Sequence, residues 1–424
     1  MERGNYLSPY RQKKARSSFK GERTVYVDTH DPSTAKPGDT LCISLPKIDN
    51  ELIIPETVEL TFDLGITLDP AEPGTTVNTY PVNNLAANIF SKIVIKLGST
   101  EVYNLEHAHL YNAYRDLWLT DKQRANSIIN GIQNEELRKL RADVRAKLPN
   151  VQESNVKLRD VYGKRYSVPL RFELIDDHSP LPTWKIEEKI TFEMTVNKKE
   201  YVLNYSNAST ADFRMTNICL KYETIKEEFL TKDILNALNG YRFLFEHIQF
   251  YHRDTISKAK TLVNQTITVS RQSLKGILIL FMNRFEDGRR DSEEFPNPSI
   301  TKLKLTIGKP GAIYNDGYNM EWQWPEAFKH FVPEELKSGQ VVFMDAAKYY
   351  SENKFGLWID LRTTEDNNLH GSGRKLKDHE IKMEITKKHT GDGEYIMHIF
   401  IVSDARVLLR DDMKFGDVEY YATK

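Results

Sequence analysis

The most constraining feature of this chain is a pattern of strands and loops that occurs once in each half. Residues 169–174 and 190–195 each alternate apolar and polar side chains and are separated by a polar loop. Residues 356–361 and 381–386 repeat this arrangement in the second half. Each half then closes with a longer apolar strand, at residues 215–224 and 396–407. Alternation with a period of two indicates strands with one buried face, so the pattern predicts two tandem β-domains of the same design.

Length and composition agree with two domains. The chain has 424 residues, which is long for one core and suits two domains of about 150 to 200 residues each. Its 59 basic and 60 acidic residues leave a formal charge of −1, so any attraction to nucleic acid or to an anionic membrane must be local. Cys42 and Cys219 are the only cysteines. Two cysteines exclude a disulfide framework, disfavour a structural zinc site and fit synthesis in a reducing compartment.

The fold class predicted from these patterns is all-β. Short strands follow one another with turn residues between them, without the strand–helix alternation of a parallel sheet, and this favours sandwiches. Leu137, Leu140 and Val144 recur at helical spacing and indicate a helical insertion, while residues 225–239 indicate a helix that ends at Gly240. The predicted organisation is an N-terminal arm at residues 1–23, a first β-domain at 24–225 with a helical insertion at about 105–150, a linker helix at 226–240, and a second β-domain at 241–424.

Targeting signals are not found in the sequence. No apolar run approaches the roughly 18 residues that a membrane-spanning helix needs. The N-terminus is basic and lacks the apolar segment of a secretory signal. We therefore expect a protein that is synthesised inside the cell and is not secreted through a signal peptide.

Three sets of residues were considered as chemical sites. Asp176, Asp177 and His178 could supply two carboxylates and an imidazole to a hydrolase or a metal site, but the neighbouring Ser and Pro favour an ordinary turn. His107 and His109 lack a further ligand at metal-binding spacing.

The third set is the glycine-rich segment 369–374, which does not join a strand directly to a helix as a phosphate loop does, so a structured loop is favoured. No nucleophile elbow, Walker loop or zinc-protease motif occurs. We therefore predict no enzyme activity, no catalytic residue, no cofactor and no metal.

An aromatic cluster stands out in the second half. It could form a platform for a sugar or a base, but such clusters more often pack in a core or in a subunit interface. We favour packing, in the core or between subunits, for Trp322, Trp324, Phe328 and Phe331.

The N-terminal arm is the one strongly charged segment. It holds seven basic and two acidic residues, enough for salt-sensitive contact with nucleic acid, an acidic protein or lipid head groups, although a solvated tail without function is the alternative. The basic residues are Arg3, Arg11, Lys13, Lys14, Arg16, Lys20 and Arg23.

In the order of these segments the chain resembles the double jelly-roll major capsid proteins, most closely those of Polinton or Maverick elements and adintoviruses. The likeness covers most of the chain, and no single motif in it is catalytic or highly specific. The segments that carry it are 88–97, 111–114, 168–174, 273–281, 295–298, 359–362 and 369–374. The charged helical stretch 121–151 departs from the family pattern.

The resemblance implies a structural protein with an eight-stranded jelly roll in each half and helical loop insertions. It implies a homotrimer with a pseudo-hexagonal outline that tiles an icosahedral, virus-like shell, in contact with neighbouring capsomers, with penton proteins and with other minor capsid proteins. The protein would be located in the virion. The basic arm would face the shell interior and contact the genome or an internal membrane.

Other classes of function make different predictions. A jelly-roll module that binds glycans or receptors, as in a spike or minor capsid protein, would bind sugars through the aromatic cluster and would not assemble into shells. A β-sandwich enzyme centred on residues 176–178 would lose bound metal or turnover on Asp177→Ala.

Overall fold

The fold was analysed in a computed structural model of the chain. It describes residues 22–68, 79–146, 165–170, 180–205, 211–226, 231–232, 234–235, 242–283, 292–308, 313–316, 320–332, 341–363, 372–376, 380–410 and 412–419. No helix in these ranges is long and apolar enough to cross a membrane.

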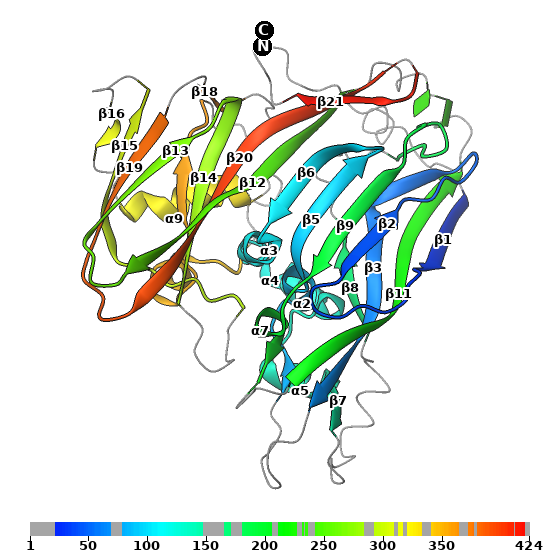
Figure 1. Cartoon of the computed structure of the whole chain (residues 1–424), viewed down its shortest axis with the longest axis horizontal. Coiled ribbons are helices and arrows are strands. Elements are labelled where there is room, and N and C mark those ends of the chain that lie inside the picture. The colour runs from blue at the N-terminus through cyan, green and yellow to red at the C-terminus, as the bar shows by residue number, and fades with distance from the viewer. Residues whose placement is uncertain are drawn as a thin grey trace.

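The first half is a sandwich of two antiparallel sheets (Figure 1). One sheet runs in the order β1-β11-β3-β8, and β7 pairs in parallel with the far end of β3. Its strands are β1 (Glu22–Thr29), β3 (Leu52–Leu68), β7 (Asp143–Ala146), β8 (Arg165–Pro169) and β11 (Ala211–Lys226). The second sheet runs β2-β9-β5-β6, with β2 (Thr40–Ser44), β5 (Phe90–Leu97), β6 (Thr100–Glu106) and β9 (Ile190–Val196).

The second half has the same design. One sheet runs β12-β20-β14-β17, extended by β18 beside β14 and β21 beside β20. Its strands are β12 (Arg242–Ser257), β14 (Arg271–Asn283), β17 (Leu357–Asp360), β18 (Arg374–Leu376), β20 (Glu394–Leu409) and β21 (Phe415–Glu419). The other sheet runs β13-β19-β15-β16, with β13 (Leu262–Thr268), β15 (Ile300–Ile307), β16 (Ile313–Asp316) and β19 (Glu380–Lys387).

The two strand orders are equivalent element by element. The eight main strands of each half are numbered in chain order, leaving out the short or additional strands β4, β7, β10, β18 and β21. In both halves the strands of one sheet then lie in the order first, eighth, third and sixth, and those of the other sheet in the order second, seventh, fourth and fifth. This is the strand order of an eight-stranded jelly roll, which avoids open edges by folding one long antiparallel ribbon into two sheets. The predicted tandem jelly rolls are therefore confirmed. The repeated segments of the second half are its sixth, seventh and eighth strands, and residues 190–195 and 215–224 lie in the seventh and eighth strands of the first half. The sixth strand of the first half, β8, ends at Pro169, and residues 171–174 of the predicted segment lie outside the described residues.

The helices lie mainly between the fifth and sixth strands of each half. In the first half this connection carries α3 (Ala108–Asp116), α4 (Asp121–Asn126), the 3-10 turn η1 (Ile128–Asn130) and α5 (Glu135–Arg141). In the second half it carries η3 (Met320–Trp322), α9 (Gln323–Phe331) and α11 (Ala346–Ser351). Smaller elements of the first half are β4 (Tyr80–Pro81), α2 (Leu85–Asn88), α7 (Lys199–Val202) and β10 (Leu203–Asn204). Thr120 begins α4 with a reciprocal cap, in which its side chain accepts from the amide of Gln123 and the Gln123 side chain accepts from the amide of Thr120.

Burial patterns differ between the two eighth strands. In β11 buried and more exposed residues largely alternate, which is the pattern of a strand with one face on the core. In β20 nearly every residue from Met397 to Ala405 is buried, so both of its faces are covered. One continuous cluster of buried apolar side chains runs through both halves. The halves therefore share a core.

Three details of the sequence prediction were wrong. Val144 lies in β7 and not in a helix, so the helical insertion ends earlier than expected. Residues 225 and 226 complete β11, where pairing with β1 and β3 extends the strand, and the described residues between 227 and 240 are helical. Arg23 belongs to β1 and pairs with Glu223 at 3.4 Å, so the arm ends before residue 22.

Candidate functional site

Several of the residues considered as chemical sites lie outside the described part of the chain. These are Asp176, Asp177 and His178, residues 369–371, and the basic residues of the arm from Arg3 to Lys20. In the described end of the glycine-rich loop, the Gly373 amide donates to Ser273 Oγ at 2.8 Å. A Cβ at Gly373 would lie 2.5 Å from the backbone of Ser273, so close packing on β14 explains this glycine.

His107 and His109 lie in an aromatic contact region at the start of α3. The His107 ring is 4.5 Å from the Phe250 ring and 5.1 Å from the His398 ring, and the His109 ring is 4.5 Å from Tyr201. Burial and the nearby charge of Arg253 lower the pKa of His107, so its imidazole favours the neutral form. In the ranges the structure describes, no three His, Cys, Asp or Glu side chains form a group that could hold a metal ion.

The four predicted aromatic residues divide into a packed group and one exposed residue. Phe331 stacks on Trp118 of the first half at 5.8 Å. The Trp324 indole donates to the Met344 carbonyl at 3.0 Å, and its ring lies 5.1 Å from Phe328. Trp322, in η3, is 61% exposed.

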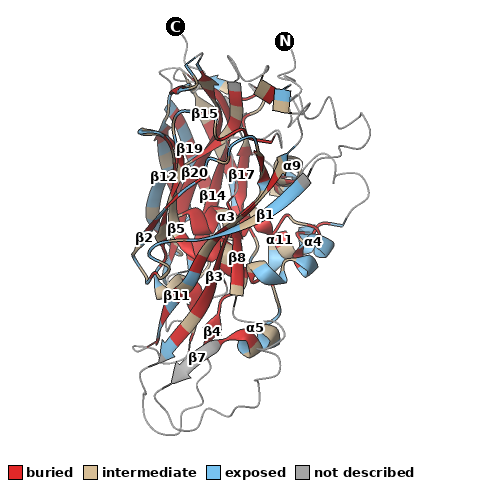
Figure 2. Cartoon of the chain, turned by 90° about the vertical axis from the view of Figure 1, so that its right-hand side faces the viewer, coloured by how far each residue is buried: buried red, intermediate tan, exposed pale blue. Residues whose placement is uncertain are grey.

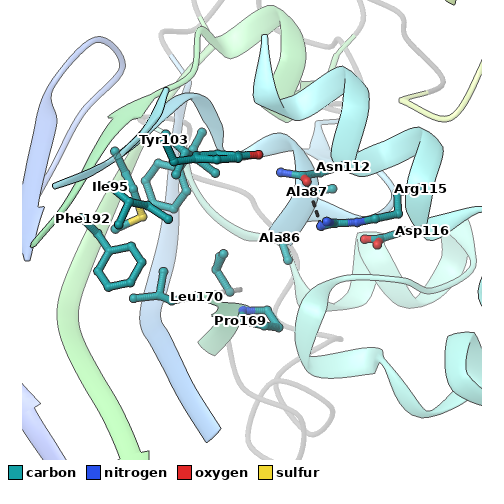
Figure 3. A pocket seen from close by; sticks show the side chains of 14 residues that line it. Ala86, Ala87, Ile95, Tyr103, Asn112, Arg115, Asp116, Pro169, Leu170 and Phe192 are labelled. Carbon is teal, nitrogen blue, oxygen red and sulfur yellow. Dashed lines mark hydrogen bonds between the residues drawn. The ribbon is translucent and has the colours of Figure 1, made fainter. Parts of the chain in front are cut away.

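A small cavity lies inside the first jelly roll (Figure 3). Its volume is about 60 Å³, and apolar side chains such as Phe192 and Tyr103 line it together with Arg115 and Asp116. Arg115 donates to Asn112 Oδ1 at 2.8 Å, so part of its hydrogen-bonding capacity is already used. Pockets for drug-sized ligands are several times larger, on the order of 300–1,000 Å³. The cavity therefore has room for little more than a pair of water molecules.

The largest assembled feature of the described chain is the junction between the two jelly rolls. Here β6 of the first half lies beside β12 of the second, and α3 lies over the outer face of the β12-β20-β14-β17 sheet (Figure 1). Tyr103 of β6 meets His247 of β12 edge to face at 5.9 Å. Tyr111 of α3 lies 5.7 Å from Phe400 of β20. These contacts bury the second face of β20.

Tyr114 sits at the centre of the junction. Its side chain is fully buried, with the ring 5.6 Å from Phe295 and 5.3 Å from Phe331. A Cβ at Gly356 would lie 2.5 Å from the Tyr114 ring, so the ring occupies space that only glycine leaves open. Burial raises the pKa of Tyr114 well above its usual range, so its hydroxyl stays protonated.

A buried ion pair also links the halves. Arg124 of α4 donates to both carboxylate oxygens of Glu293 at 2.9 Å, and the two side chains are only 8% and 4% exposed. Asn83 donates to the same carboxylate at 2.9 Å, and Arg124 also donates to the Asp116 carbonyl at 2.9 Å. Both bonds to Glu293 come from the single nitrogen Nη2, and this charge-assisted contact holds α4 against the second half.

A second group of charged side chains is buried under α9. Lys275 of β14 lies 3.1 Å from Glu246 and 3.0 Å from Asp404. Burial by itself would raise the pKa of Glu246, but the charge of Lys275 outweighs it and lowers that pKa. His330 of α9 stacks on Trp358 at 4.0 Å, with Nε2 at 3.8 Å from Glu246. Burial lowers the pKa of His330 to about 4, so this imidazole is neutral at physiological pH.

Comparison with known proteins assigns the fold. No family model matches the sequence, and no curated protein matches it. Among solved structures, the chain is similar to PBCV-1 VP54, fitted into a reconstruction of the virophage Sputnik, with 11% identity, 94% of this chain and 97% of that chain covered, and a TM-score of 0.59. The mavirus major capsid protein has 10% identity, 93% and 89% coverage and a TM-score of 0.51. The Faustovirus major capsid protein has 9% identity, with 92% of this chain and 91% of that chain covered, and a TM-score of 0.54.

The chain has the double jelly-roll fold. Identities this low establish a shared fold and no more.

Removing one charge of the buried pair should destabilise the junction. Glu293→Gln leaves the guanidinium of Arg124 buried without its counter-ion, and we expect a loss of about 3–5 kcal/mol in the free energy of unfolding. The measurement is the midpoint of urea or thermal unfolding. Glu135→Gln, which breaks the exposed Glu135–Lys139 pair, is the matched control and should change the midpoint little. Equal shifts for the two variants would contradict this account.

The buried imidazole should make stability depend on pH. His330 is neutral in the fold down to pH about 4, whereas in the unfolded chain it binds a proton near its ordinary pKa of 6.5. Stability should therefore fall as pH drops below 6.5, by at most about 1.4 kcal/mol per pH unit, until pH reaches about 4. His330→Gln should flatten the dependence of the unfolding midpoint between pH 6.5 and 5. Parallel curves for wild type and variant would show that His330 is not responsible.

Proposed function

We propose that this protein is a major capsid protein whose copies associate as trimeric capsomers in an icosahedral, virus-like shell. The observation that carries the proposal is that only one of two equivalent sides of each jelly roll takes part in the internal junction. The chain joins the β6 side of its first half to the β12 side of its second half. The equivalent sides, formed by β1 in the first half and β16 in the second, lie at opposite ends of the molecule (Figure 1).

A ring follows from this arrangement. Joining β16 of one copy to β1 of the next would repeat the internal junction, with the same two kinds of side facing each other. Such a head-to-tail contact closes only if the rotation per copy divides a full turn. Three copies place six similar jelly rolls around the axis, and their pseudo-hexagonal outline suits a shell that is tiled by one kind of unit.

The similar solved structures support the proposal. Those of mavirus and Faustovirus are named as major capsid proteins, and another is a quasi-atomic model of the PBCV-1 virus capsid. By analogy we propose that this chain is located in the virion after synthesis inside the host cell. Its partners would be neighbouring capsomers, penton proteins and other minor capsid proteins, and it would have no enzyme activity.

The assignment to Polinton or Maverick elements and adintoviruses is the narrowest part of the proposal. It rests on the sequence segments from 88–97 to 369–374 and on their order along the chain. A glycan-binding module is less well supported, because three of the four aromatic side chains of its platform pack within the chain.

Trimer formation is tested directly by light scattering on a sizing column. We expect a stable species of about 148 kDa, three times 49.2 kDa, with a pseudo-hexagonal outline in electron micrographs of the same peak. A protein that remains a monomer at every concentration, with or without co-expressed viral proteins, would refute the proposed function.

The basic arm is proposed to act inside the shell, on the genome or on a membrane. Deleting residues 2–20 removes its basic residues up to Lys20 and spares β1, which begins at Glu22. Trimers should form normally, whereas shell closure or packaging should be impaired, because the salt-sensitive contacts of the arm are lost. Shells are counted by electron microscopy after assembly, and replacing the same basic residues with Gln provides a control of equal length. Normal, filled shells from both variants would rule out this role.

A further inference from the structure

We infer that the exposed outer face of β1 and β11 binds the η3–α9 segment of a neighbouring copy, with Trp322 as its anchor. We call this face, formed by Arg23, Val25, Val27, Lys221 and Glu223, the β1 face. The inference rests on the proposed function, since it assigns the contact through which the trimer would close.

The internal junction provides the template. Within one chain, the connection after the fifth strand of the first half supplies α3, which covers the outer face of the first and eighth strands of the second half. His107 contacts Phe250 of β12 at 4.5 Å, and Tyr111 contacts Phe400 of β20 at 5.7 Å. A similar contact between copies would place the connection after β16 of one copy, which carries η3 and α9, on β1 and β11 of the neighbouring copy.

The receiving side of that contact is open in the single chain. Val25 and Val27 of β1 are 55% and 57% exposed, and they lie opposite Glu223 and Lys221 of β11 on the outer face. Figure 2, in which this end of the molecule faces the viewer, shows β1 largely exposed. On the equivalent outer face of the second half, Ile248 of β12 is buried and Glu246 and Phe250 are partly buried, and His107 of the first half packs on Phe250. The β1 face is the counterpart of this face in the first half, and no element in the described part of the chain covers it.

The covering side is also open. Trp322 is the most exposed aromatic residue among the large apolar side chains that the structure describes as exposed, at 61%. It belongs to η3, which opens the connection equivalent to that of α3 and lies against β15. The Tyr350 hydroxyl donates to the Met320 carbonyl at 2.7 Å and so holds η3 in place. An exposed tryptophan on a fixed backbone is the kind of residue that dominates binding at interfaces.

The charges of the β1 face are compatible with being covered. Arg23 lies 3.4 Å from Glu223, and Lys221 lies 3.4 Å from Glu59. Because these charges are already paired with neighbouring side chains, a partner can cover them without burying a charge that has no counter-ion. A face of two valines among paired charges also keeps the monomer soluble before assembly, whereas the more extensively buried internal junction forms as the chain folds.

Cross-linking tests the contact and its direction. Val27→Cys and Trp322→Cys are introduced together into the full chain, in which Cys42→Ser and Cys219→Ser remove the native thiols. Treatment of assembled trimers with a short bis-maleimide should give a covalent trimer on a denaturing gel, because each copy is linked through two different surfaces. Each single variant should give no covalent trimer. A double variant that trimerises in solution but yields no covalent trimer would overturn the inference and leave the proposed function intact.

Substitution provides the second measurement. Val25→Asp with Val27→Asp, and separately Trp322→Ala, should each weaken trimer association by about tenfold or more, since each removes apolar contact at the centre of the interface. Leu262→Asp is the matched control, because Leu262 is 45% exposed on β13, at the opposite edge of its sheet from β16. Thermal unfolding of each monomer checks that the variants fold. Unchanged trimers in both interface variants would refute the inference, and a wild-type protein that never trimerises would refute both proposals.

Discussion

Burial of the outer face of the β12-β20-β14-β17 sheet is the constraint on which the rest of the structure depends. A sheet in a jelly roll ordinarily packs one face on its core and leaves the other in water. Here the outer face carries side chains such as Phe400 and Val402, and it is stable only under a cover. Helix α3 of the first half covers this face at Phe400, and α9 of the second half covers it at Trp358. The two jelly rolls therefore share one core and keep a fixed arrangement.

That arrangement also explains the buried polar groups. Covering the sheet removes Lys275, Glu246 and Asp404 from water, and each charge then needs a counter-ion at close range. Arg124 and Glu293 meet the same requirement at the edge of the junction. Among the described residues, no helix covers the outer face of β1 and β11, and Val25, Val27 and the charged side chains of that face are accessible. The two equivalent jelly rolls therefore differ in how far the outer face of the sheet that holds the first and eighth strands is buried.

Much of the fold could be predicted because strand alternation and turn residues are local signals. The repeat matched β19 and β20 to β9 and β11 correctly, whereas the segment 169–174 that it matched to β17 overlaps β8 only at Pro169. The sequence patterns do not predict α9 or α11, and residues 322–331 stand out in the sequence only as an aromatic cluster. Val144 was assigned to a helix by its spacing, yet pairing with β3 makes it part of a strand. For Val144 and for the aromatic cluster, contacts between residues distant in sequence decided the structure, and a short local pattern could not.

The sequence by itself determined that the chain forms two similar antiparallel β-domains, because residue periodicity is set by which face of each strand is buried. The sequence also predicts that Trp322, Trp324, Phe328 and Phe331 pack in the core or in a subunit interface. Only the tertiary structure decided which of these side chains pack within the chain and which are exposed. Phe331 stacks on Trp118, 213 positions away in sequence, whereas Trp322 stays exposed. Periodicity reports that a side chain is apolar and on one face, whereas the partner that covers it depends on how distant segments meet.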